Sequence, residues 1–151
     1  MITPHSRITQ SLQVARYAAT AGISLGVIAI DQLSKASYSS YTLNINGYLS
    51  SPIPNKGAVM IASAVLLMLG IVALRAFKYP LNRMVLTGLA LEIGGGVSNI
   101  LDRVFLGGVR DILHLPTTAF NLADVAIVCG AVMILLSITT DLIRLSWYHS
   151  Y

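Results

Sequence analysis

The chain has 151 residues, of which 55% are hydrophobic and only 11% are charged. A soluble domain carries roughly 25% charged residues, so these residues are too few to cover a water-facing surface, and lipid is the expected solvent. The net charge of +4 comes from basic residues that stand singly, not from a stripe interleaved with aromatics, which argues against a nucleic-acid partner. The one cysteine, Cys129, lies inside an apolar run, so an internal disulfide and a cysteine metal cluster are both excluded.

Four apolar segments are long enough to cross about 30 Å of hydrocarbon, which takes roughly 20 residues. They cover residues 17–30, 57–74, 81–101 and 121–142. Arg16 extends the first segment, because its long side chain can reach the headgroups. That segment starts like a cleaved signal peptide, but no small-x-small site follows it and three more spans do, so a retained helix is expected. The sequence predicts one all-α membrane domain over residues 1–151, a four-transmembrane-helix bundle.

Basic residues near the span ends predict the orientation. Six of them fall on one side: Arg7, Arg16, Arg75, Lys78, Arg83 and Arg144. Four fall on the other side: Lys35, Lys56, Arg103 and Arg110. Because basic residues favour the cytoplasmic side, both termini are expected in the cytoplasm. Residues 36–56 and 104–119 then form a small extracytoplasmic polar layer, and weak alternation in Tyr-Thr-Leu-Asn-Ile predicts a short strand pair in the first of these linkers.

The acidic residues gather at the outer ends of the spans. Four lie there: Asp31, Asp102, Asp111 and Asp124. Only Asp141 falls on the inner side, and Glu92 lies within the third span. Acids in or beside spans are costly and often mark function, so a shared polar site is expected at the outer face.

Polar residues near these acids repeat at helical spacing. Asn99, Asp102 and Arg103 share a face at the end of the third span, and Asn121 and Asp124 stand three apart at the start of the fourth. Taken singly, each is explained by a helix cap or an interfacial ion pair. Taken together, they favour one site.

Five stretches carry a resemblance that covers most of the chain. They are Asp-Gln-Leu-Ser-Lys (31–35), Asn-Lys-Gly-Ala (55–58), Gly-Gly-Gly-Val-Ser-Asn-Ile-Leu-Asp-Arg (94–103), Gly-Val-Arg-Asp (108–111) and Phe-Asn-Leu-Ala-Asp (120–124). In this order they resemble the lipoprotein signal peptidase family, also called signal peptidase II, and the chain looks like a shortened member. The resemblance implies an aspartic endopeptidase of the bacterial cytoplasmic membrane. Its substrate is a lipid-modified prolipoprotein, whose signal peptide is cut off before the lipidated cysteine.

The resemblance also implies roles for single residues. The catalytic pair falls on Asp111 and Asp124, at the outer face. The substrate-binding positions are Asn55, Asn99, Arg103 and Asn121. The supporting positions are Asp31, Lys35, Gly57, Asp102 and Ala123. Two close carboxylates cannot both ionise, so one keeps a proton while the other takes a proton from the attacking water. This chemistry needs no metal or other cofactor, its partners are the substrate and membrane lipids, and no oligomer is implied.

Glu92 leaves a different function open. It stands seven residues before Asn99, two turns deeper on the same face. A protonated, hydrogen-bonded carboxyl facing the bundle is one explanation, and a small proton-coupled transporter centred on Glu92 is the other. A non-catalytic relative that binds lipidated peptides with the same residues is a third alternative. The glycines at 94–96 predict close helix packing.

Overall fold

The computed structural model describes residues 4–45 and 81–148. Three helices in this part of the chain are long and apolar enough to cross a membrane. They are α1 (Pro4–Ser37), α3 (Arg83–Leu106) and α4 (Leu122–Tyr148). Three of the four expected spans are therefore helical. The fourth, at 57–74, lies outside the described residues, as do Asn55 and Gly57.

Two helices run beyond their predicted ends. α1 continues past residue 30 to Ser37, because Asp31 and Lys35 find partners on the neighbouring helices and do not need water. α3 continues past residue 101 to Leu106 and ends at Gly107, whose φ of 75° is left-handed and whose N–H donates to the carbonyl of Arg103. Glycine adopts that conformation without strain, which makes it a common helix terminator.

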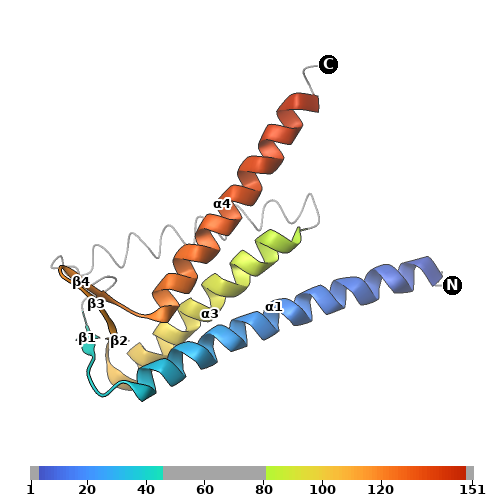
Figure 1. Ribbon diagram of the computed structural model, residues 1–151. Helices are drawn as coiled ribbons and strands as arrows, with labels where there is room; N and C mark the ends of the chain where they lie inside the picture. The colour runs from blue at the N-terminus through green and yellow to red at the C-terminus, as the bar shows by residue number, and fades with distance from the viewer. Residues whose placement is uncertain (1–3, 46–80, 149–151) are drawn as a thin grey trace.

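The helices converge at the end that carries the strands and spread apart toward the other end (Figure 1). α1 and α3 run parallel, since Ser24 Oγ donates to the carbonyl of Ala90 and Gln32 Nε2 donates to that of Ser98. α4 runs antiparallel to α3, and a Cβ at Gly95 would lie 2.5 Å from the carbonyl oxygen of Ala123. Only glycine permits this approach.

The predicted role of the glycine run is confirmed for two of its three members. Gly94 faces α1, where an added Cβ would lie 2.8 Å from the carbonyl oxygen of Ser24, and Gly95 faces α4. Among the described residues, a Cβ at Gly96 would meet nothing within 4 Å, so close packing at Gly96 stays a prediction. Three consecutive helical residues point in three directions, and the direction of Gly96 is that of neither α1 nor α4.

In the described residues, four three-residue strands form two small sheets, which lie at the convergent end of the helices (Figure 1). They are β1 (Thr42–Asn44), β2 (Val109–Asp111), β3 (Leu113–Leu115) and β4 (Thr118–Phe120). β1 pairs antiparallel with β2, aligning Thr42 with Asp111, and β3 forms a hairpin with β4. The strand expected in the first linker therefore exists, but its partner comes from the second linker. The side of the membrane on which these strands lie remains a prediction.

Candidate active site

Asn121 connects the two acids expected to form the catalytic pair. Its Nδ2 donates to Asp111 Oδ1 at 2.8 Å, while its backbone N–H donates to Asp124 Oδ2 at 3.2 Å. Asp124 N–H donates in return to Asn121 Oδ1 at 3.0 Å. This exchange is a capping box, in which the residue before the helix and the third residue within it satisfy each other's backbone. The start of α4 thus places one buried residue in contact with both carboxyl groups.

Amides from two further elements bind the remaining oxygens of this pair. Asn44 Nδ2 on β1 donates to Asp111 Oδ2 at 3.2 Å. Asn99 Nδ2 on α3 donates to Asp124 Oδ1 at 2.9 Å. Each oxygen of the pair therefore accepts a hydrogen bond from a rigid neighbour. Amide donors hold the carboxyls in place without supplying a full positive charge.

The environment of Asp111 favours its protonated form. Burial raises the pKa of the Asp111 carboxyl, while the hydrogen bonds from Asn44 and Asn121 and the positive charges of Lys35 and Arg103 act in the opposite direction. Desolvation penalises the charged form of any carboxyl group. Here it outweighs the hydrogen bonds and the nearby cations.

Lys35 is the buried cation of the site, with only 1% of its surface exposed. Its Nζ lies 2.6 Å from Asp31 Oδ2 and 3.2 Å from Asp102 Oδ2. It also donates to Asn99 Oδ1 at 3.1 Å. That bond fixes the orientation of the Asn99 amide, so that its Nδ2 is turned toward Asp124. Lys35 therefore neutralises two acids and orients the donor to a third.

Asp31 ties three helices together. Its Oδ2 accepts from Ser98 Oγ on α3 at 2.7 Å, and its Oδ1 accepts from the backbone N–H of Ala123 on α4 at 2.9 Å. Ala123 lies in the first turn of α4, where backbone N–H groups have no partner within the helix. The carboxylate of α1 thus satisfies a donor of α4, and the supporting role of Asp31 in the site stays a prediction.

Arg110 fastens β2 to the helices. Its backbone N–H and Nε donate to Asp102 Oδ2, and its NH2 group donates to Asp102 Oδ1 at 2.8 Å and to Gln32 Oε1 at 2.7 Å. Gln32 Nε2 in turn donates to Asp102 Oδ1 at 3.0 Å. Because Asp111 is the next residue, this clamp fixes the strand that carries it.

The structure brings most of the expected residues into one buried cluster. The members of the cluster are Asp31, Lys35, Asn99, Asp102, Asp111, Asn121, Ala123 and Asp124. Arg103 is exposed, so its side chain does not share the buried face of Asn99 and Asp102. Its charge still acts on Asp111. In the part of the chain that the structure describes, no three His, Cys, Asp or Glu side chains group as metal ligands.

Four residues that contact the cluster were not expected from the sequence: Gln32, Asn44, Ser98 and Arg110. Gln32, Ser98 and Arg110 lie inside three of the recognised stretches, so their position was a usable signal. Asn44 reaches Asp111 only through the pairing of β1 with β2, which no local pattern reveals.

Glu92 lies apart from this cluster, in the middle of α3. It is 4% exposed, and neither of its carboxyl oxygens has a hydrogen-bond partner among the described residues. It packs against α4, where a Cβ at Gly130 would lie 2.9 Å from its Cγ. The expected burial is confirmed, whereas the expected hydrogen bond is absent from the described part of the chain.

Known proteins are similar to this chain in both sequence and fold. Residues 23–140 match the family model of signal peptidase (SPase) II. The lipoprotein signal peptidase of Moorella thermoacetica is 36% identical over 132 residues, covering 74% of this chain and 87% of that protein. The lipoprotein signal peptidase of Burkholderia vietnamiensis is 36% identical over 140 residues, which cover 76% of this chain and 83% of that protein. A shorter match, 46% identical over 78 residues, spans 45% of the lipoprotein signal peptidase of Paraburkholderia phytofirmans.

A solved structure supports the fold independently. A bacterial membrane enzyme determined by the in meso method at 2.3 Å superposes with a TM-score of 0.61, at 19% identity, over 82% of this chain and 89% of that one. At this identity the likeness concerns the fold alone. The family match covers most of the chain and includes all three described helices at the site. The chain therefore belongs to the signal peptidase II family of bacterial membrane proteins.

Proposed function

We propose that this protein is an aspartic endopeptidase that removes the signal peptide of lipid-modified prolipoproteins by cutting before the lipidated cysteine. Its relatives are named lipoprotein signal peptidases. The observation that carries the proposal is the double contact of Asn121, which hydrogen-bonds Asp111 and Asp124 at once. Two carboxyl groups that share one bridging residue are suited to act on one water molecule.

In the proposed reaction the pair holds a single proton, because two adjacent carboxylates cannot both ionise without a large cost. The charged carboxylate accepts a proton from water as the water oxygen attacks the peptide carbonyl carbon. The protonated carboxyl hydrogen-bonds the carbonyl oxygen and stabilises the negative charge that develops there. The proton then passes to the departing amine, and the C–N bond breaks. The raised pKa of Asp111 supports a pair that keeps one proton.

The surrounding residues are proposed to serve this pair in different ways. Asn99 and Asn121 position the carboxyl groups, while the exposed Arg103 lies at the edge of the cluster where a peptide can reach it. Asn55 and Gly57, which lie outside the described residues, keep their proposed roles in substrate binding and support. We further propose a bacterial cytoplasmic-membrane protein of four spans, with both termini in the cytoplasm and the pair at the outer face.

A small proton-coupled transporter is the competing function, because Glu92 is a buried carboxyl without a partner among the described residues. A transporter requires its key acid in the middle of the bundle, which fits Glu92. It assigns no role to the interlinked acids at the strand end. A non-catalytic binder of lipidated peptides would use those residues without needing either Asp111 or Asp124 to transfer a proton.

The deciding experiment is cleavage of a lipidated precursor by membranes that contain the wild-type protein, Asp111→Asn, Asp124→Asn, the double variant, or Glu92→Gln. An amide cannot accept the proton from water, so each aspartate variant should lose at least about 10²–10⁴-fold in rate. The double variant should lose little more, because the two groups act as a unit. Glu92→Gln should retain activity. Gel-shift processing gives the rate, and immunoblotting gives the amount of each variant in the membrane.

Two outcomes would contradict the proposal. If Glu92→Gln abolished a proton-coupled flux that both aspartate variants retained, and neither the wild-type protein nor any variant cleaved the precursor, the transporter would be correct. If the wild-type protein bound the precursor but never cleaved it, the chain would be a binding relative.

A further inference from the structure

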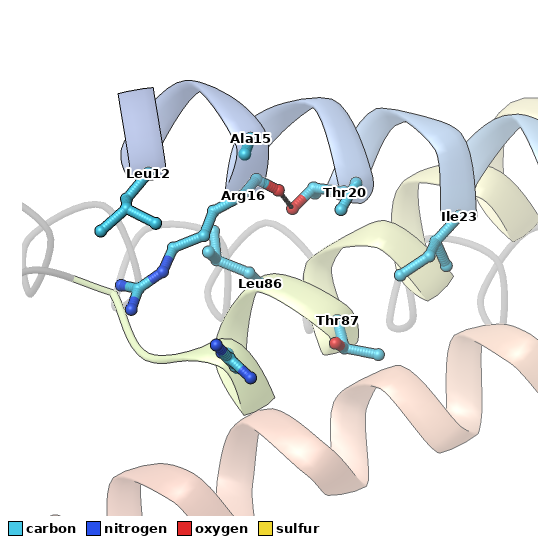
Figure 2. A pocket seen from close by; sticks show the side chains of 9 residues that line it. Leu12, Ala15, Arg16, Thr20, Ile23, Leu86 and Thr87 are labelled. Carbon is cyan, nitrogen blue, oxygen red and sulfur yellow. Dashed lines mark hydrogen bonds between the residues drawn. The ribbon is translucent and has the colours of Figure 1, made fainter. Parts of the chain in front are cut away.

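A cavity of about 460 Å³ lies between α1 and α3 (Figure 2). Its walls are largely apolar, with Leu12 and Ile23 contributed by α1 and Leu86 by α3. Two guanidinium groups, those of Arg16 and Arg83, line the same space. In Figure 2, Arg16 extends from α1 toward the beginning of α3. An apolar groove with two cations at one end has the polarity of a lipid-binding site.

The cavity lies near one boundary of the membrane-spanning helices. The apolar stretch of α1 begins at Gln10, and that of α3 begins at Arg83. Ser24 and Gln32 of α1 contact Ala90 and Ser98 of α3, in each case 66 positions later in the chain, so Arg16 lies at nearly the same depth as Arg83. Arg83 precedes Asn99 by 16 residues, so at a rise of 1.5 Å per residue the cations lie about 24 Å from the candidate active site. They are therefore at the level of the headgroups of the leaflet opposite that site.

No described acid neutralises these two arginines, since neither forms an ion pair within residues 4–45 and 81–148. Four of the six acids of the chain belong to the strand end, and Glu92 lies in the middle of α3. Asp141 is the one acid at the same end as the cavity, and it belongs to α4, which does not line the cavity. Two like charges beside one cavity repel each other, and an anion between them removes that repulsion.

We propose that this cavity binds one anionic phospholipid, whose phosphate lies between Arg16 and Arg83 and whose acyl chain runs along Leu12, Ile23 and Leu86. Arginine is suited to phosphate because its planar fork donates two parallel hydrogen bonds. The apolar walls need a hydrocarbon partner, since Leu12 is 58% exposed and Ile23 is 36% exposed. The bound lipid bridges α1 and α3 where the helices spread apart, which is a role separate from cleavage.

The test uses the full-length protein in bilayers with equal amounts of phosphatidylglycerol and phosphatidylcholine, followed by native mass spectrometry of the lipids that stay bound. Each cation near a membrane surface contributes about fivefold to binding of an anionic lipid. Arg16→Gln and Arg83→Gln should therefore each reduce retained phosphatidylglycerol by about fivefold, and the double variant by about 25-fold. The variant Arg7→Gln/Arg144→Gln removes the same charge elsewhere on α1 and α4 and should retain the lipid. Circular dichroism confirms that each variant is folded.

A lipid role predicts that Arg16→Lys/Arg83→Lys keeps most of the selectivity, because the charge is preserved. Equal retention of both lipids by the wild-type protein would overturn the proposal. So would an equal loss in the Arg7→Gln/Arg144→Gln control, which would mean that net charge alone selects the lipid. Release of the lipid by millimolar inorganic phosphate would show that the site recognises the free anion. A cysteine cross-link from Leu12→Cys to residues 57–74 would show that the chain itself fills the groove.

Discussion

The buried acids at the strand end of the helices differ from the buried acid in their middle in how their oxygen atoms are satisfied. Asp31 and Asp102 contact a buried lysine, and both Asp111 and Asp124 accept hydrogen bonds from amides. Glu92 is equally buried, yet its two oxygens have no partner among the described residues. A buried charge needs partners to remain ionised. The strand end can therefore hold charges that take part in chemistry, whereas the middle of α3 favours a neutral carboxyl.

The difference follows from what each position can reach. At the strand end, the ends of three helices meet the small strands (Figure 1). Backbone N–H groups and polar side chains of these elements donate to the acids there, as Ala123 does to Asp31 and Asn44 to Asp111. In the middle, the neighbours of α3 are helical segments whose backbone groups already bond to each other. Burial alone therefore does not mark a functional acid in a membrane bundle.

The largest expected effect comes from removing the cation at the strand end. Lys35→Met should lower the free energy of unfolding by about 3–5 kcal/mol, because it leaves a buried carboxylate unpaired. Asp102 keeps its ion pair with Arg110, so the carboxylate left without a cation is that of Asp31. Lys35→Met/Asp31→Asn should therefore recover part of the loss. Unfolding in mixed micelles with increasing dodecyl sulfate, followed by circular dichroism, measures both values. Equal losses in the single and double variants would mean that Asp31 is not held by Lys35.

A second change loosens the strand without touching the proposed catalytic pair. Arg110→Gln removes the side-chain bonds to Asp102 and Gln32 that hold β2, so Asp111 loses its fixed position. A misplacement of about 1 Å can cost about 10²-fold in rate. We expect kcat to fall by about that factor while KM changes little, measured with a fluorescent lipopeptide. A rise in KM at unchanged kcat would instead assign Arg110 to substrate binding.

A substitution in the middle of α3 is expected to raise the free energy of unfolding instead of lowering it. Glu92→Met replaces a carboxyl without described partners by an apolar side chain of similar length, which should raise the free energy of unfolding by about 1–3 kcal/mol. The same titration with dodecyl sulfate measures this free energy of unfolding. Leu89→Met serves as the control for a change of side-chain shape in the same helix. Destabilisation by Glu92→Met alone would reveal that the carboxyl is satisfied from outside the described residues.

The smallest expected effect is on the pH dependence of kcat. The positive charge of Arg103 lowers the pKa of Asp111, in opposition to burial. Arg103→Gln should therefore raise that pKa, so the loss of activity on the alkaline side should move to higher pH, because the pair keeps its proton longer. Arg103 is exposed, so screening by solvent and salt should keep this shift small. The pH profile of kcat at low and high salt tests this, since added salt should shrink the difference between the two proteins. A shift to lower pH would contradict the assigned direction.

The helices and most of the acidic cluster could be predicted from the sequence, because apolar length and helical spacing are local signals. The predicted face of Asn99 and Asp102 is the buried face of α3, and Asp124 is in the first turn of α4. The predictions failed where pairing is non-local. Three-residue strands carry almost no pattern, so neither the pairing of β1 with β2 nor the bond from Asn44 to Asp111 could be anticipated. The exposure of Arg103 could not be predicted either, since spacing alone does not say which face of a helix its neighbours cover.

The bond from the carboxylate of Asp31 to the backbone of Ala123 also bears on how the molecule assembles in a bilayer. Asp31 is near the end of the first helix of the chain, and Ala123 is at the start of the last one. The first turn of the last helix therefore gains this hydrogen-bond partner only when the first helix has docked against it. Insertion of the individual helices and maturation of the site are therefore separate events. A polypeptide severed between these helices can enter the membrane as two fragments, yet it gains a complete site only when the fragments associate.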